Sequence, residues 1–448
     1  MLRSVFSGAG VILLLMASGT YGFLLETRHI FPFKLLKYAR LRLNPPKGAT
    51  REPHPERAAE TPSLDAIRHL ANLPYLEGYS PPTAGGVIRA YDRTLVQDGL
   101  NFFTSGNAPE AILMDMDGKV VKRWTADALK AIPGVQLSTS HSGHESFLRD
   151  AQLLPDGGII GMFDEIGVVR LDASSRVEWV WRGPVHHDLC LDEEGHAWSI
   201  LHERRVVPEL NRVEPVLDDF FVELSSEGKL LRRMSLADSF LRSRYAAMLL
   251  DIPAFSEDVF HTNSIVVLDG SAAGRLPAFR RGNLLVSIKR LNAVAVIDPD
   301  ARKVVWALAG QWYGQHSARL LPSGHVLLFD NLGTMRPASR VLEVDPVTQQ
   351  VIWSFGGRDG ENILSETVGF VERLGNGNTL ITESDRGRVL EVTPDHRVVW
   401  EFVNPALVGK HKEHVAIVYF MERVSRDQPF LTREVSEARA SPGPEHPR

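Results

Sequence analysis

Apolar and polar residues alternate in short runs along most of this chain, and glycine-containing turns separate the runs. The stretch Trp306–Asn331 is an example, with the run QHSARLL, the turn PSG and the run HVLLFDN. Runs of this length between such turns are typical of antiparallel β-strands. The pattern therefore predicts a chain built mainly of β-hairpins from about residue 80 onward.

A two-strand motif recurs along this part of the chain. In each copy an apolar strand leads into a turn, and the next strand ends in tryptophan, or in methionine in the third copy. The six copies span residues 112–124, 168–181, 221–234, 294–306, 341–353 and 389–400. A unit of about four strands cannot bury both of its faces alone, and a closed ring of units leaves only short edges. We therefore expect an all-β, six-bladed β-propeller over residues 80–424, with the tryptophans packed between blades.

One segment interrupts the strands. Leu236–Ile252 has apolar residues at helical spacing and no strand pattern. This pattern predicts a helical insertion between the third and fourth units, which could serve as a lid or as a contact surface in a homodimer.

The N-terminal segment Val5–Leu25 contains no charged residue. Its length matches the ~20 apolar residues that cross a bilayer, which favours an uncleaved transmembrane helix over a cleaved signal peptide. We expect a membrane anchor with a basic juxtamembrane segment over residues 1–43, a proline-rich linker over 44–79 and a disordered tail over 425–448.

The charges beside this segment do not settle its orientation. Five basic residues follow the span and only Arg3 precedes it, which by the positive-inside rule favours a cytoplasmic body. The basic segment can instead lie on anionic headgroups, and a long domain crosses the membrane largely regardless of such charges.

Composition excludes some classes of function. The net charge is -5 and no basic stripe is present in the body, which argues against a nucleic-acid partner. The single cysteine, Cys190, allows no intramolecular disulfide. No glycine-rich phosphate loop of the P-loop type occurs, which agrees with a substrate other than a nucleotide.

Four residues hold equivalent places before the repeat turns. His316, His187 and Arg149 each lie eight residues before a turn glycine, and His261 lies nine before one. Because the first residues of an inner strand face the channel of a propeller, we expect three imidazoles and a guanidinium to meet at one axis. His186 is an alternative to His187, since a one-residue slip would exchange their faces.

Two more cations follow in the fourth unit. Lys289 and Arg290 are expected on its next strand, where alternation sends them to opposite faces, so that one reaches the channel. Cations repel a metal ion and suit an anionic ligand, so we expect no metal and no cofactor. The alternatives are a metal-dependent propeller hydrolase or oxygenase that uses the three histidines, and a propeller that only binds a partner.

Five motifs of this chain resemble the arylsulfate sulfotransferase family, the bacterial enzymes that do not use PAPS. They are VHHDLCLDEEGHAW, FHTNSIVVLDG, LLVSIKRLNAVAVIDP, GQHSARLLPSGHVLLFDN and NGNTLITESDRGRVLEVTP, and they lie between about Asp150 and Pro405. The resemblance implies a six-bladed propeller that is exported to the periplasm. It also implies transfer of a sulfuryl group from an aryl sulfate donor to a phenolic or hydroxyl acceptor through a sulfo-histidine.

The resemblance implies roles for the channel residues. His316 looks like the nucleophile, His261 and Asn263 like channel partners of the transferring group, and His187 like the histidine of the H-H-D motif. Because imidazole titrates near neutral pH, we expect His187 and His261 to act as acid to the leaving phenolate or as base to the acceptor. Sulfuryl transfer needs in-line positioning and charge stabilisation, and a neutral imidazole can attack sulfur and later leave.

The substrate-binding set implied by the same reading contains Asn263, Lys289, Arg290, Arg149 and His186. The family commonly has arginine where Lys289 aligns, and lysine keeps the charge but loses the bidentate fork. The resemblance also favours export, so we expect a single-pass inner-membrane protein with its propeller in the periplasm.

Overall fold

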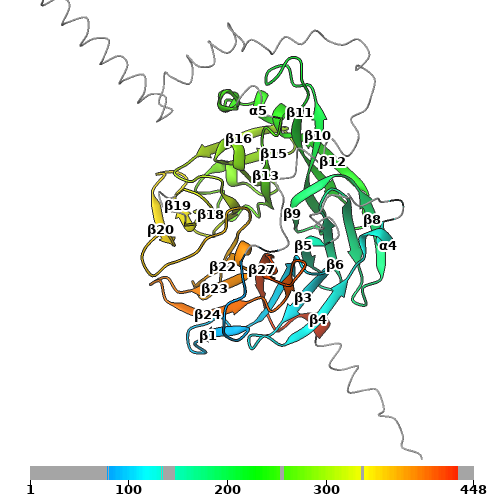
Figure 1. The fold of residues 1–448 in the computed structure, drawn as a ribbon. Helices are drawn as coiled ribbons and strands as arrows, with labels where there is room; N and C mark the ends of the chain where they lie inside the picture. Colours follow the sequence, from blue (N-terminus) through cyan, green and yellow to red (C-terminus); the bar gives the residue numbers. More distant parts are fainter. Residues whose placement is uncertain are drawn as a thin grey trace, which may run out of the picture.

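The structure, a computed structural model, describes residues 78, 80–132, 134, 147–252, 257–333 and 338–431. Six antiparallel sheets of four or five strands surround one axis, which confirms the predicted six-bladed β-propeller (Figure 1). The predicted anchor over residues 1–43 and nearly all of the linker lie outside the described residues, as does the tail from residue 432. None of the helices in the described ranges combines the length and the apolar character that a bilayer crossing needs.

Each blade is a meander that runs from the channel to the rim. Blade 1 contains β27 (Val418–Val424), β2 (Leu100–Ser105), β3 (Glu110–Met114) and β4 (Val120–Thr125). Blade 2 contains β5 (Leu148–Leu153), β6 (Ile159–Phe163), β7 (Gly167–Leu171) and β8 (Val177–Arg182). Blade 3 contains β9 (Val185–Leu191), β10 (Ala197–Arg205), β11 (Val216–Leu224) and β12 (Leu230–Ser235).

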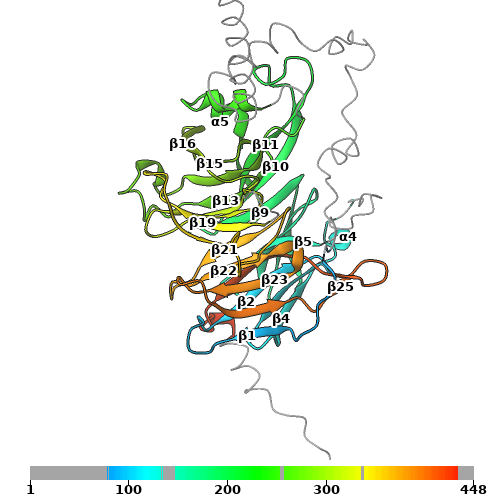
Figure 2. The same cartoon turned by 60° about the vertical axis from the view of Figure 1, so that its left-hand side comes forward.

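The remaining blades follow the same order. Blade 4 contains β13 (Thr262–Val267), β14 (Leu284–Ile288), β15 (Ala293–Asp298) and β16 (Lys303–Ala309). Blade 5 contains β17 (His316–Leu320), β18 (Val326–Asp330), β19 (Arg340–Val344) and β20 (Val351–Phe355). Blade 6 contains β21 (Phe370–Arg373), β22 (Thr379–Glu383), β23 (Arg388–Val392), β24 (Val398–Val403) and the added edge strand β1 (Ile88–Tyr91). A short hairpin, β25 (Leu407–Val408) and β26 (His414–Val415), projects beside blade 6 (Figure 2).

The two ends of the propeller close the ring. The C-terminal strand β27 is the inner strand of blade 1, where it pairs with β2, and the N-terminal strand β1 pairs with the outer strand of blade 6. In Figure 1 β27 lies between β5 and β22, the strands that it contacts on either side. Segments from opposite ends of the chain are therefore needed to complete blades 1 and 6.

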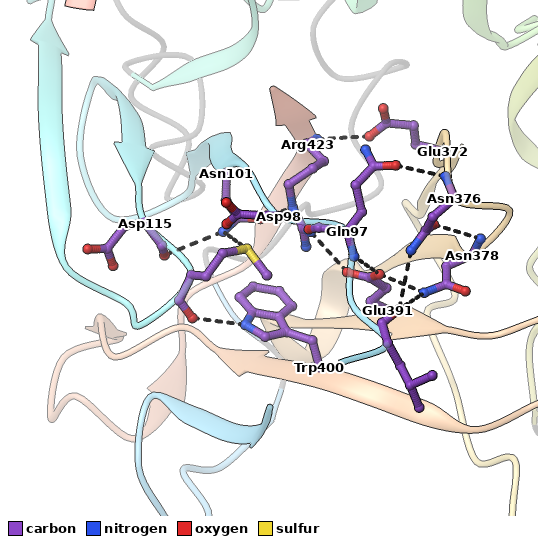
Figure 3. A network of polar contacts seen from close by, with 12 residues as sticks. Gln97, Asp98, Asn101, Asp115, Glu372, Asn376, Asn378, Glu391, Trp400 and Arg423 are labelled. Atoms are coloured by element: carbon purple, nitrogen blue, oxygen red, sulfur yellow. Dashed lines mark hydrogen bonds and ion pairs between the residues drawn. The ribbon is translucent and has the colours of Figure 1, made fainter. Parts of the chain in front are cut away.

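Arg423 on β27 anchors this closure in a polar network whose central ion pair is fully buried (Figure 3). Its guanidinium pairs with Glu391 at 2.9 Å, bonds Asn101 Oδ1 at 2.9 Å and also donates to the backbone carbonyl of Gln97. Its backbone N–H donates to Glu372 at 2.9 Å. These contacts connect β27 to β2, β21 and β23, and a buried charge held this way is costly to leave unpaired.

The motif-ending tryptophans join neighbouring blades, as predicted. The indole N–H groups of three of them donate to backbone carbonyls in turns of the next blade. The bonds run from Trp124 to Gly157, from Trp353 to Pro394 and from Trp400 to Met116. In blade 2 it is Trp179, two residues before the end of the motif, that reaches Ser226 of blade 3.

The inner strands are tied together by a repeated side-chain bond. In each case a side-chain oxygen near the start of one inner strand accepts the backbone N–H of the next inner strand. The bonds are Asp150 to Leu189 at 2.8 Å, Asp188 to Ile265 at 2.8 Å, Ser264 to Ala318 at 3.1 Å and Ser317 to Val371 at 3.2 Å. These links fix the relative height of the inner strands around the channel.

The segment Leu236–Ile252 contains two short helices, α5 (Leu236–Leu241) and the 3-10 helix η2 (Ala246–Asp251). Ser235 caps α5 by accepting the backbone N–H of Asp238. Helix α5 packs against β11, β12 and β16, so it covers the outer seam between blades 3 and 4. Further short helices are α4 (Ala128–Ala131), η3 (Pro277–Phe279), η4 (Lys289–Leu291) and η5 (Ser384–Arg386).

Candidate active site

Four inner strands are irregular at the same end of the channel. The pairing register shifts in β5 near Arg149, in β9 near His187, in β13 near Asn263 and in β17 near Ser317. A β-bulge re-aims the extra side chain of its strand. All four of these residues line one cavity of about 30 Å³ on the axis, together with His316.

Two imidazoles, those of His187 and His316, line this cavity, and a third, that of His261, lies beside His187. The ring centroid of His187 is 4.9 Å from that of His261 and 6.4 Å from that of His316. His187 and His261 have positive φ angles of 67° and 52°, which non-glycine residues rarely adopt. Such backbone strain is found where a side chain is held in a functional position.

His316 is held by a chain of buried hydrogen bonds. Its Nδ1 lies 2.8 Å from Oδ1 of Asn331 and 3.1 Å from the carbonyl of Gly314. The amide of Asn331 donates to the carbonyls of Ser365 at 2.7 Å and Val368 at 2.6 Å, which fixes its oxygen toward the imidazole. Because both groups near Nδ1 are acceptors, Nδ1 carries the proton and Nε2 keeps its lone pair. Nε2 is buried and has no hydrogen-bond partner among the described residues.

The three imidazoles are uncharged at neutral pH. Burial lowers the pKa of His316 well below its usual value, and nearby Lys289 adds to the effect. Burial and the neighbouring His261 lower the pKa of His187 in the same way. Burial also lowers the pKa of His261, although its hydrogen bond to Asp258 opposes this. A neutral imidazole is the form that can act as a nucleophile or a base.

The predicted cations lie at different depths. Arg149 is buried, lines the cavity, stacks on the ring of Tyr419 at 4.6 Å and lies 3.8 Å from Asp164. Lys289 is mostly buried, whereas the side chain of Arg290 is 52% exposed and faces Asp258 at 3.7 Å.

The expected strand alternation at Lys289 and Arg290 is wrong. Strand β14 ends at Ile288, and the two cations form the short 3-10 turn η4, which closes at Asn292 with a left-handed φ of 47°. The two residues therefore do not continue the strand, and the alternation of strand faces does not apply to them. Lys289 is the one that influences the pKa values of His316 and His261.

Two predicted residues take unexpected positions. Asn263 lines the cavity, but its Nδ2 donates to the carbonyl of Gln315 at 2.7 Å and its buried Oδ1 has no partner among the described residues. His186 is turned away from the cavity lining, toward Asp219 and His202 of its own blade.

Several cavity residues were not found from the sequence. Tyr419 comes from the closing strand β27, whose place in blade 1 no local pattern shows. Asp150 and Asp188 lie beneath the imidazoles, where burial and the neighbouring Asp188 raise the pKa of Asp150 well above its usual value. Gly369, by contrast, is placed by the sequence, because it lies eight residues before the turn glycine Gly377 as His316 does before Gly324. A Cβ at Gly369 would meet the ring of Phe329 at 2.5 Å.

Comparison with known proteins gives one family match and several distant structural likenesses. The sequence model of the arylsulfotransferase (ASST) family matches residues 150–405. No curated protein sequence matches the chain. A protein of unknown function from Bacteroides caccae has 12% identity and a TM-score of 0.48, over 72% of this chain and 98% of that one.

Two other solved structures have lower TM-scores. A catalytically inactive virginiamycin B lyase from Staphylococcus aureus with quinupristin has 10% identity and a TM-score of 0.39, over 70% of this chain and 88% of that one. The Cps50 (Swd1) β-propeller domain from Myceliophteria thermophila has 13% identity and a TM-score of 0.40, over 77% and 99% of the two chains. The family match covers more than half of the sequence and includes all three channel histidines, so this chain belongs to the arylsulfotransferase family.

Proposed function

We propose that this protein transfers a sulfuryl group from an aryl sulfate to a phenolic or hydroxyl acceptor, with His316 as the group that carries it between the two. The observation that carries the proposal is the state of His316. Its Nδ1 is tied to Asn331, its buried Nε2 has no partner among the described residues, and its ring lines the axial cavity. An uncharged imidazole whose second nitrogen keeps an unbonded lone pair is the arrangement that attack on sulfur requires.

In the first half-reaction Nε2 of His316 forms a bond to sulfur while the bond from sulfur to the aryl oxygen breaks. The departing oxygen takes a proton from His261. The negative charge of the bound ester raises the pKa of nearby imidazoles, and Asp258 stabilises the cationic form of His261 through Nδ1. The products are a phenol and sulfo-His316.

In the second half-reaction the acceptor hydroxyl attacks the sulfur of sulfo-His316. His261 takes the hydroxyl proton, the bond between sulfur and Nε2 breaks, and the original state returns. Oδ1 of Asn263, which is buried at the cavity without a partner among the described residues, can accept the acceptor hydroxyl before attack. The same imidazole thus serves as acid and then as base.

Two cations suit the oxygens of the transferring group. Arg149 reaches the cavity wall, and Lys289 lies close enough to His316 to depress its pKa. Preformed donors in a water-poor site stabilise charge that develops in the transition state more strongly than water does. Tyr419, stacked on Arg149, offers an aromatic face to the aryl donor.

We also propose that the propeller lies on the periplasmic side of the inner membrane, held by Val5–Leu25. The uncharged length of that segment and the family membership support this placement. A reporter that is active only after export, fused behind residue 448, should be active. A reporter that is active only in the cytoplasm would then be silent, and the reverse result would reject the placement.

The transfer mechanism is tested by trapping. The purified protein is incubated with an aryl sulfate without acceptor, and intact mass and peptide mapping should locate one added sulfuryl group on His316. His316→Asn should release no phenol and carry no adduct. His325→Asn, which changes a histidine bonded to Glu343 outside the cavity, is the matched control and should behave as wild type. An adduct on His316→Asn, or no adduct on folded wild type with several donors, would overturn the proposal.

A further inference from the structure

Blade 3 brings three polar side chains to one face of its sheet. His202 on β10 lies directly opposite Asp219 on β11, and His186 on β9 lies opposite Ile200, two residues before His202. Side chains two residues apart on a strand share a face, and so do direct cross-strand partners. His186, His202 and Asp219 therefore gather at the channel end of one sheet face.

These three residues are buried, with exposed fractions of 5%, 5% and 1%. One potential ligand atom from each lies within 4.8 Å of the others. Nε2 of His186 is 3.4 Å from Oδ1 of Asp219, and it has no hydrogen-bond partner among the described residues. A buried ring nitrogen with no partner, aimed at a carboxylate, is a rare and costly arrangement in a native protein.

The 3.4 Å between Nε2 of His186 and Oδ1 of Asp219 fits two ligands of one metal ion better than a hydrogen bond. Two ligands with metal bonds of about 2.1 Å at a tetrahedral angle stand about 3.4 Å apart. Two imidazoles that share one ion have ring centroids about 4.6–5.3 Å apart for angles of about 90–110° at the ion, as follows from the same bond length. The rings of His186 and His202 have their centroids 4.6 Å apart.

Each of the three side chains also has a contact with a group outside this cluster. Nε2 of His202 lies 3.0 Å from Glu165, which leaves Nδ1 for another partner. Oδ2 of Asp219 accepts the backbone N–H of Thr262 at 2.8 Å, and Nδ1 of His186 lies 2.7 Å from Nδ1 of His187. Metal-binding histidines and carboxylates are typically oriented by such outer partners.

We propose that His186, His202 and Asp219 bind one divalent first-row transition-metal ion, with zinc as the ion that the ligand set fits best. Two imidazoles and one carboxylate with further positions open are suited to Zn²⁺ or Fe²⁺ and not to Ca²⁺ or Mg²⁺. The carboxylates of Asp219 and Glu165 balance the charge of the ion. This site is separate from the channel histidines His187, His261 and His316, which do not form such a cluster among the described residues.

The site would act on the sulfuryl-transfer centre through His187, a consequence that rests on the proposed function. A metal ion on Nε2 of His186 leaves the proton of that ring on Nδ1, which then donates to Nδ1 of His187. The remaining proton of a neutral His187 is thereby fixed on Nε2, where it can donate to an oxygen of the sulfuryl group. The metal would set a tautomer and would not touch substrate.

The test uses the full chain, stripped with a chelator and then titrated with Zn²⁺ and with Co²⁺. Wild type should take up about one equivalent of Zn²⁺ by elemental analysis after desalting, and Co²⁺ should give the visible absorption of a four- or five-coordinate site. His202→Gln and Asp219→Asn each remove a ligand, so each should weaken binding by more than the about 10–100-fold that loss of an outer partner costs. His316→Ala should retain the ion, so that failure of the transfer mechanism and failure of this proposal remain distinguishable.

The matched control is His196→Gln. His196 belongs to the second histidine–carboxylate group of the described residues, with Asp192 and Glu223, which is partly exposed. This variant should bind Zn²⁺ as wild type does. Binding below about one tenth of an equivalent by wild type, full binding by folded His202→Gln and Asp219→Asn, or loss in His196→Gln would each overturn the proposal.

Discussion

Replacing Asn331 by leucine tests how the fold prepares His316. Asn331 is fully buried and joins three groups, because its oxygen accepts from Nδ1 of His316 while its nitrogen donates to the carbonyls of Ser365 and Val368. Leucine has nearly the same shape and makes none of these bonds. The variant therefore removes the orientation of the imidazole with little change in packing volume.

The expected effect on rate follows from charge. As Nε2 forms its bond to sulfur, the ring of His316 becomes cationic, and the bond from Nδ1 to Asn331 becomes charge-assisted. A hydrogen bond to a charged group contributes about 1.5–3 kcal/mol, against about 1 kcal/mol for a neutral pair. The carbonyl of Gly314 remains as a second acceptor at 3.1 Å, so Nδ1 keeps its proton. The difference, about 0.5–2 kcal/mol, is what the transition state gains over the ground state. Since about 1.4 kcal/mol is a factor of ten, sulfation should slow by about 2–30-fold.

The measurement is single-turnover release of phenol from an aryl sulfate, normalised to folded protein. Asn378→Leu is the matched control, because Asn378 is an equally buried asparagine whose amide bonds Leu95 and Glu391 in the ring closure, away from the cavity. Both variants should lose about 2–4 kcal/mol of unfolding free energy. Only Asn331→Leu should lose rate, and a rate within a factor of two of wild type would refute the assigned role.

Three further predictions concern pH and stability. Because burial holds the pKa of His316 well below 6.5, His316 stays uncharged and phenol release in single turnover should not slow as the pH falls from 8 to about 6. A decrease in rate centred at or above pH 6.5 would contradict this. Arg423→Met breaks the fully buried pair with Glu391 and should lower the free energy of unfolding, measured with denaturant, by about 3–5 kcal/mol. Arg426→Met removes an exposed ion pair and should lower it by less than about 1 kcal/mol. Equal losses in the two variants would show that the buried pair does not stabilise the ring closure. Burial raises the pKa of Glu372 to about 8 from a usual 4.5. As the pH rises from 5 to 8, the unfolded chain therefore releases this proton at a lower pH than the folded protein does, and wild type should lose stability relative to Glu372→Gln. Parallel curves of unfolding free energy against pH for the two proteins would show that no such shift exists.

The sequence predicts the blades because their determinants are local. The alternation of apolar residues, the turn glycines and the terminal tryptophans all lie within one motif, and each copy folds as β3–β4 does in blade 1. The two short strands that close blades 1 and 6 carry no such motif, and their partners lie at the other end of the chain. Closure is a property of the whole ring, so no single stretch of sequence shows it.

The sequence likewise predicts only part of the candidate site. The spacing to the turn glycine places His187, His261 and His316 at one end of the channel, because that spacing is the length of the inner strand. Which side chain reaches the axis depends on bulges, and these depend on the partner strand. The prediction for Lys289 was wrong because it assumed that the strand continues regularly through this residue. Asn292, three residues later, is a residue typical of left-handed turns and could have indicated the end of β14.

The bulges give adjacent residues separate tasks. In β9 Asp188 accepts the backbone N–H of Ile265 in the next blade, while His187 before it faces the cavity with a φ of 67°. Asn tolerates this backbone conformation, so His187→Asn should change the unfolding free energy by less than about 1 kcal/mol. It should reduce turnover by about 10²–10³-fold, because the transferring group loses a hydrogen-bond donor to its oxygens. Asp188→Leu should instead cost about 1–3 kcal/mol, because the N–H of Ile265 loses its acceptor in the core of the ring. Denaturant unfolding and turnover of both variants separate the role of His187 in catalysis from a role in stability. A His187→Asn protein as unstable as Asp188→Leu would show that the imidazole also stabilises the fold.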